Sequence, residues 1–141
     1  MCCVACIGGG KAWISVDHNT IIRIDIHGTV QNTVITKYYH GPRIISVTRR
    51  KEIVYSGCNS RTVEIVRNGQ SETLITTPQD WTLEGFCCTR FGDILVYVYY
   101  EDSWISREKS KIIRYQQIHI KDEISIDGLG NSNFTNTSSS L

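Results

Sequence analysis

The chain has 141 residues, 40% hydrophobic and 9% aromatic, with 15 Lys and Arg against 14 Asp and Glu. These values are typical of one globular domain, and a net charge of +1 gives no general attraction to nucleic acid or anionic lipid. The longest apolar run, 94–100, is far shorter than the roughly 20 residues that cross a bilayer, so we expect no membrane partner.

The N-terminal segment predicts a cytoplasmic chain with reduced thiols. Residues 2–7 are apolar, but no basic residue precedes them and the run is too short for a secretory signal. Without secretion, disulfides are not expected among the six cysteines, which are Cys2, Cys3, Cys6, Cys58, Cys87 and Cys88. The Cys3-x-x-Cys6 pair has no second pair at ligand spacing, so we expect no metal site and no cofactor.

The chain repeats itself with a period close to 41 residues. Residues 44–55 match 85–96 at this offset, and the same offset backwards leads to 3–14. The second halves repeat as well, because 22–28 aligns with 63–69. A third copy continues at 113–115 after an insertion of about nine residues within 99–111. Such a period indicates repeated supersecondary units.

Within each period the segments have the pattern of short antiparallel strands. Apolar residues alternate with polar ones, as in Ile22, Ile24 and Ile26 against Arg23 and Asp25. Turn signals separate the segments, such as the glycines at 8–10 and the Asn-Gly pair at 68–69. Four short strands in about 40 residues are typical of a β-propeller blade, and a plain β-sandwich is the alternative.

We therefore predict an all-β fold, an incomplete β-propeller of about three four-stranded antiparallel blades. The blades are expected at about 3–40, 41–80 and 81–122 within a propeller region at 1–127. The Asn-, Ser-, Thr- and Gly-rich residues 128–141 predict a disordered tail. Closed propellers have at least four blades, so three should not close a ring alone. We expect self-association through the open blade edges.

Residues 41–65 resemble an NHL repeat. The resemblance lies in the Gly41-Pro42 start, the two apolar strands that follow, and Asn59, Arg61 and Val63 of the family's Asn-x-Arg-Val element. This unit has Gly57 or Cys58 where the family commonly has Asp.

The string from Thr62 to Val96 looks like the C-terminal propeller of tripartite-motif (TRIM) proteins, in the divergent form abundant in molluscs. The resemblance covers about residues 3 to 120 and implies a module that binds the partner or substrate of a ubiquitin ligase. Relatives carry the ligase chemistry in a RING domain, beside B-boxes and a coiled coil. The paired Cys/His ligands of a RING and sustained heptads are absent from this sequence. We therefore expect no enzyme activity in this chain.

Catalytic constellations are weak. The segment 8–11 lacks the first glycine and the final Ser/Thr of a phosphate-binding loop, and a turn explains it. A Cys58 nucleophile with His40 as base has no third group beside it. A metal-dependent hydrolase propeller would need carboxylates on the axial strands, which instead carry apolar residues such as Val4, Ile45 and Phe86.

A binding surface is predicted where the loops between the second and third strands meet the connections between blades. This face would gather aromatic and basic side chains, a mixture that protein hot spots and single-stranded RNA platforms share. The candidate residues are Tyr38, Tyr39, His40, Arg43, Arg61, Trp81, Trp104 and Arg107. The alternative is that Trp81 packs between blades and that the tyrosines cover blade edges. The turn at 49–51 would lie on the opposite face, where a solvated turn is expected.

The charge of this face favours a protein partner over RNA. Its basic residues are offset by acidic ones, including Asp80, Glu84 and Glu101. RNA binding remains the alternative, and it would make affinity fall steeply with salt.

Overall fold

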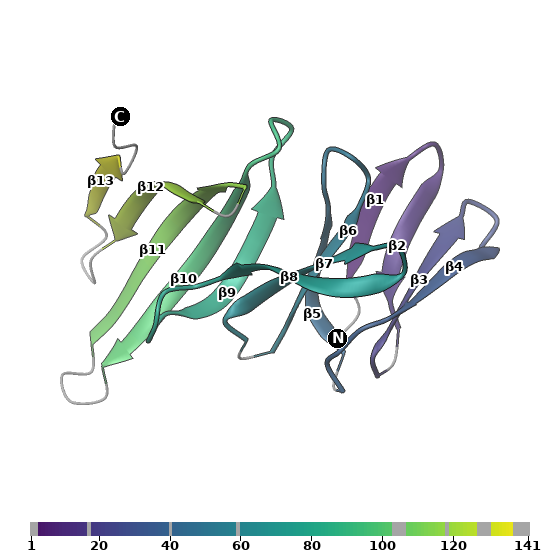
Figure 1. Cartoon of the computed structure of the whole chain (residues 1–141), viewed down its shortest axis with the longest axis horizontal. Helices are drawn as coiled ribbons and strands as arrows, with labels where there is room; N and C mark the ends of the chain where they lie inside the picture. The colour runs from purple at the N-terminus through teal and green to yellow at the C-terminus, as the bar shows by residue number, and fades with distance from the viewer. Residues whose placement is uncertain are drawn as a thin grey trace. The chain divides into compact units, whose positions relative to one another are not determined.

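The chain forms antiparallel β-sheets, as predicted (Figure 1). The structure is a computed structural model that describes residues 3–16, 18–39, 41–58, 60–102, 107–117, 119–126 and 131–136. For residues 101, 102, 107 and 108 it describes the backbone alone. All regular elements in these ranges are strands, and they make three sheets, two of four strands and one of five. None of the described residues belongs to a helix long and apolar enough to cross a membrane.

The first two sheets each consist of four consecutive strands paired in chain order. The first contains β1 (Val4–Gly8), β2 (Lys11–Ser15), β3 (Thr20–Asp25) and β4 (Val30–Ile35). The second contains β5 (Pro42–Val47), β6 (Ile53–Gly57), β7 (Thr62–Arg67) and β8 (Gln70–Thr76). This order is the up-and-down pairing of a propeller blade.

The third sheet has one strand more than predicted. Its strands, also paired in chain order, are β9 (Thr82–Cys88), β10 (Ile94–Asp102), β11 (Arg107–Gln116), β12 (His119–Ile126) and β13 (Ser132–Asn136). The strand β13 lies within the tail for which composition predicts disorder. The structure differs here because β13 pairs along β12, with Phe134 opposite Ile124, and gives that edge its hydrogen-bond partners.

The expected loop between β10 and β11 is also different. The predicted insertion at 99–111 lengthens the two strands, which pair from Val98 and Lys111 out to Asp102 and Arg107. Arg107 is therefore the first residue of a strand and does not lie in a loop. The hairpin lengthens because cross-strand pairing continues without a break through Tyr99 opposite Ser110 and Tyr100 opposite Lys109.

The chain divides into two compact units, Met1–Thr76 and Thr77–Leu141. The first unit contains the two four-stranded sheets, and the second contains the five-stranded sheet.

The 41-residue period reappears in the backbone of the turns. Gly10, Lys51 and Gly92 are 41 residues apart, and each has a positive φ, of 69°, 64° and 90°. These residues sit at the same point of the β1–β2, β5–β6 and β9–β10 turns. A positive φ brings the Cβ of an ordinary residue close to its backbone, and glycine has no Cβ. Lys51 therefore has a strained backbone conformation, whereas Gly10 and Gly92 do not.

The same turn is closed by a threonine in the second and third sheets. Thr48 Oγ1 accepts a hydrogen bond from the amide of Glu52 at 3.1 Å, and Thr89 Oγ1 accepts one from the amide of Asp93 at 3.2 Å. The acid at the end of each turn then binds an arginine of the third strand. Arg67 Nε lies 2.9 Å from Glu52, and Arg114 Nε lies 2.8 Å from Asp93.

The core of the first unit lies between its two sheets. Trp13, Ile21 and Val34 come from one face of the first sheet, and Ile45, Ile53 and Tyr55 come from the second. Strand alternation places these residues on one face of each sheet. In the second sheet the other face is buried as well, since Val54, Val63 and Ile65 are at most 2% exposed. Full burial of side chains of this size stabilises by roughly 1.5–3 kcal/mol each.

In the second unit the buried face of the sheet carries Leu83, Val96, Val98 and Ile113. Between Val96 and Val98 stands Tyr97, which points to the other face and is 39% exposed. The alternation expected of half-buried strands is thus present in this unit too.

Candidate functional site

The predicted binding residues fall in both units of the chain. Tyr38, Tyr39, Arg43 and Arg61 belong to the first unit, and Trp81 and Arg107 belong to the second. His40 and Trp104 lie outside the described residues, as does the side chain of Arg107. The residues that the structure brings together are those around the segment 36–41, which connects β4 to β5 and which we call the linker.

Tyr38 is an internal anchor of the linker. Its hydroxyl lies 2.7 Å from Thr62 Oγ1 and 2.8 Å from Ser60 Oγ, at the start of β7. Its ring meets that of Tyr55 edge to face, with centroids 5.9 Å apart. A Cβ at Gly57 would lie 2.6 Å from the Tyr38 ring, so the ring needs a glycine there. The polar and apolar parts of Tyr38 are both engaged inside the unit.

Lys37 binds a buried carboxylate next to this anchor. The side chain of Glu64, on β7, is 0% exposed, and its Oε1 lies 2.6 Å from Lys37 Nζ. Thr73 on β8 donates to Glu64 Oε2 at 3.0 Å, and Tyr38 donates to Oε1 at 3.5 Å. The carboxylate therefore has one cation and two hydroxyl donors, which offset the cost of its burial.

The Glu64 carboxylate also determines the protonation of Lys37. Burial acts to lower the pKa of the ammonium, but the hydrogen bond and the charge of Glu64 outweigh it and raise the pKa above its usual value. Lys37 is thus held as a cation, and it ties the linker to the second sheet. Neither Lys37 nor Glu64 was among the predicted binding residues. The one available signal was a carboxylate flanked by Val63 and Ile65 in an apolar strand.

Two backbone contacts attach the linker to the β2–β3 loop. The amide of Thr36 donates to the carbonyl of Asn19 at 2.6 Å. Gly41 has a φ of +81°, and a Cβ there would lie 2.1 Å from the carbonyl oxygen of His18. Only glycine permits both this conformation and this approach. The linker is therefore fixed at both of its ends.

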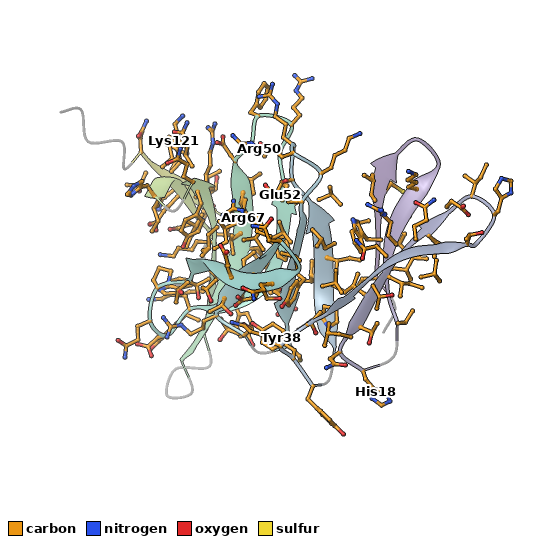
Figure 2. The ribbon with its side chains drawn as sticks, turned by 45° about the vertical axis from the view of Figure 1, so that its right-hand side comes forward. His18, Tyr38, Arg50, Glu52, Arg67 and Lys121 are labelled. Carbon is orange, nitrogen blue, oxygen red and sulfur yellow. The ribbon has the colours of Figure 1, made fainter. Side chains whose placement is uncertain are left out.

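Tyr39 stands out from this fixed linker. It is 77% exposed, and its ring centroid lies 6.5 Å from that of His18, whose residue is also exposed. Figure 2 shows His18 and Tyr38 at one end of the first unit and Arg50 and Glu52 at the other. Arg61 follows Ser60, which binds Tyr38, so its backbone is placed at the linker end as well. We call Tyr39, His18 and Arg61 the linker-end surface.

Arg43 contributes differently. It lies on β5 and is half-buried, and its carbonyl accepts a hydrogen bond from Cys3 Sγ at 2.6 Å. This contact joins the N-terminal residues to the second sheet.

Trp81 packs within the second unit. Lys111 Nζ lies 4.3 Å from the centroid of its ring, and the Tyr100 ring lies 5.9 Å away. Lys111 also binds Glu123 at 3.3 Å and is only 12% exposed. A partly desolvated cation over an indole stabilises by about 1–2 kcal/mol, so Trp81 has a clear packing role.

On the other face of the same sheet, two buried carboxylates bind a partly exposed arginine. Arg114 on β11 donates to Asp93 Oδ2 at 2.8 Å through Nε and to Asp122 Oδ2 at 3.4 Å through Nη1. Among the described residues no group of His, Cys, Asp and Glu is arranged to hold a metal ion.

The comparisons with known proteins concern the fold. No protein-family model matches the chain, and no curated protein matches it in sequence. Similar solved structures include the WD40 domain of Neurospora crassa Pan2, with a TM-score of 0.51 and 11% identity, and streptogramin B lyase, with 0.50 and 9%. The alignments cover 97% and 93% of this chain but 53% and 52% of those chains. The chain thus spans about half the length of these proteins, and its fold is that of a β-propeller.

Proposed function

We propose that the chain is a non-catalytic module that binds a protein partner through the linker-end surface. The observation that carries this proposal is Tyr39, a large aromatic side chain that is 77% exposed on a linker fixed by its neighbours. Lys37, Tyr38 and Gly41 all make contacts that hold the backbone around it.

Such an arrangement suits protein recognition. Aromatic side chains, together with Arg, are the commonest hot-spot residues, because they bury a large area with few rotatable bonds. Binding costs less when the segment that carries them is already ordered. Tyr39 can therefore enter a pocket of a partner, with His18 and Arg61 at the rim.

The state of the buried carboxylates supports a non-catalytic role. Glu64 is paired with Lys37, and Asp93 and Asp122 share Arg114. A general acid or base needs a carboxylate that is open to substrate, and these three are engaged with cations. The fold itself does not decide, since propellers host both binding domains and enzymes.

The finer part of the proposal follows the resemblance of the sequence to TRIM propellers. We infer that the module selects the partner or substrate of a TRIM-type ubiquitin ligase whose catalytic domain lies elsewhere. Support comes from Asn59, Arg61 and Val63 of the NHL pattern and from the string Thr62 to Val96.

The test uses two positions of equal exposure. Tyr39 and Ile26 are both 77% exposed in the first unit, and Ile26 lies in the β3–β4 turn at the opposite end. A photo-crosslinking amino acid at 39 or at 26 would capture partners in cells, and each captured partner would then be purified. We expect Tyr39→Ala to weaken binding of the partner captured at 39 by about 30-fold, the effect of a hot spot near 2 kcal/mol.

Ile26→Ala is the matched control, and it should leave the affinity within about two-fold, as do neutral surface residues. Equal losses in both variants, or none in Tyr39→Ala, would contradict the proposal. Capture of RNA, with an affinity that falls steeply with salt, would favour the RNA alternative.

A further inference from the structure

The first sheet has one face that the second sheet covers and one that it leaves open. The open face is built from three rows of neighbouring side chains across the strands. The rows are Cys6, Ala12, Ile24 and Val30; Val4, Ile14, Ile22 and Thr33; and Val16, Thr20 and Ile35. Four of its aliphatic side chains are well exposed: Val4 at 59%, Val16 at 39%, Val30 at 53% and Ile35 at 62%.

None of the residues in these rows is charged. The charged residues of the same strands alternate with them and lie on the covered side, where Lys11 is opposite Asp25 and Arg23 is opposite Trp13. A sheet face that meets water normally carries polar side chains, whereas a contiguous apolar area marks an interaction site. The open face has the composition of a surface that another sheet covers.

The second unit carries a complementary surface. One row across its sheet consists of Tyr97, Ile112, Ile124 and Phe134, each opposite the next on β10 to β13. Phe134 is 64% exposed, and Ile112 and Ile124 are half-buried. We call this row the ridge. In the row beside it the charges of Arg114 and Asp122 neutralise one another at 3.4 Å.

We propose that the open face of one copy of this chain docks against the ridge of a second copy. Two observations favour a second copy as the occupant. Both surfaces belong to this chain, so two copies can satisfy both of them. The chain also spans only 53% and 52% of the propellers it resembles, so two copies together have about the length of one of those chains.

Size also favours a reciprocal pair. With strands about 4.8 Å apart and a rise of about 3.3 Å per residue, a four-stranded face of five residues measures about 19 by 17 Å. One contact of this size is smaller than the roughly 800 Å² per partner of a stable interface. When each copy gives its open face to the ridge of the other, two such contacts form, and each copy uses both of its apolar surfaces. Each contact joins two different surfaces, and a two-fold axis relates the two contacts of the pair.

Analytical ultracentrifugation of the full chain tests this proposal. We expect a mass twice the 16.0 kDa of one chain at micromolar concentration. Ile35→Lys on the open face and Tyr97→Lys on the ridge should each weaken the dimer at least 100-fold, because each buries a charge in the contact. Both positions are exposed in the single chain, so circular dichroism should be unchanged. If Ile35→Lys unfolds, Val4→Lys replaces it.

Mixing the two variants tests the pairing of open face with ridge. The Tyr97→Lys copy retains its open face and the Ile35→Lys copy retains its ridge, so a mixed pair has one unmodified contact, whereas a pair of either variant alone has none. The mixture should therefore associate more tightly than either variant alone and less tightly than the unmodified chain. Tyr39→Lys is the control on the linker-end surface and should dimerise as the unmodified chain does. A monomer at all concentrations, or a dimer that Ile35→Lys leaves intact, would overturn the proposal. A mixture that associates no more tightly than either variant alone would overturn the pairing of open face with ridge. Neither result bears on partner binding through Tyr39.

Discussion

The two units of the chain bury carboxylates in different ways. In the first unit Glu64 is bound by a single cation, Lys37, which comes from the linker between two sheets. In the second unit Arg114 is bound by two carboxylates, Asp93 in the β9–β10 turn and Asp122 on β12. The first ion pair joins the linker to the second sheet, and the second stays within one sheet and its turn. Loss of one charge should therefore lower stability more in the first unit, because Glu64 has no second cation among the described residues.

The largest expected effect comes from removing the single cation. Lys37→Met leaves Glu64 buried with hydroxyl donors only. We expect the free energy of unfolding to fall by about 2–3 kcal/mol, near the low end for broken buried pairs, because Lys37 is itself 45% exposed. Urea unfolding followed by circular dichroism would measure it. Hydrogen exchange should quicken in β4 and β7.

The double variant Lys37→Met/Glu64→Gln is the control for this effect. It removes the buried charge and keeps an acceptor for Thr73, so most of the stability should return. If the double variant is as unstable as Lys37→Met, the uncompensated charge is not the cause.

A smaller effect is expected from Asp93→Asn in the second unit. Arg114 loses one carboxylate but keeps Asp122, and the asparagine can still accept a hydrogen bond. We expect a loss of about 1–2 kcal/mol, with faster hydrogen exchange confined to 77–141. A cost larger than that of Lys37→Met would reverse the comparison between the two units.

The smallest effect at neutral pH is expected from Tyr115→Phe. The Tyr115 hydroxyl is buried and has no hydrogen-bond partner in the part of the chain that the structure describes, so its removal should be neutral or slightly stabilising. Burial, and then the charge of Glu123, raise the pKa of Tyr115 from 10.0 to about 12.

This raised pKa predicts a loss of stability at high pH. Because the folded-state pKa lies above the ordinary one, the contribution is fully present below pH 10 and is lost as the pH rises toward 12. In Tyr115→Phe the decline over this range should be shallower, and the rise in absorbance near 295 nm that accompanies tyrosine ionisation should be smaller near pH 12. An unchanged pH profile would show that other groups cause the decline. Lys37 titrates in the same direction and is present in both proteins.

Local patterns were sufficient to predict most of the strands. The alternation around Ile22 and Ile24, the glycines of the turns and the 41-residue repeat all depend on neighbours in sequence, and they predicted antiparallel sheets of four strands. The strand β13 was not predicted, because its polar composition describes a tail, whereas its backbone pairing with β12 depends on an open edge that composition does not reveal.

The candidate site was predicted in part, because its geometry depends on contacts between sheets. Tyr38 and Tyr39 are adjacent and identical in type, and the sequence grouped them together. In the structure they have different roles. The Tyr38 ring packs on Gly57 and its hydroxyl binds Thr62, whereas Tyr39 is exposed. Glu64 and Lys37 are 27 residues apart, and the 41-residue repeat gives no reason to expect an ion pair between them. Predicting the linker-end surface would thus have required knowing how β6 and β7 lie against the linker.

The close passage of Gly41 beside His18 has a consequence for the order of folding. The contacts that shape the linker from the side of the first sheet, at His18 and Asn19, are made with residues only about 20 positions earlier in the chain. The contacts with Thr62 and Glu64 need residues that are synthesised only after the whole linker. The linker can therefore take its conformation against the first sheet before β7 folds. Lys37 and Tyr38 are then already in position when β7 packs against them. In this sense the linker acts as a template on which the second sheet takes its register.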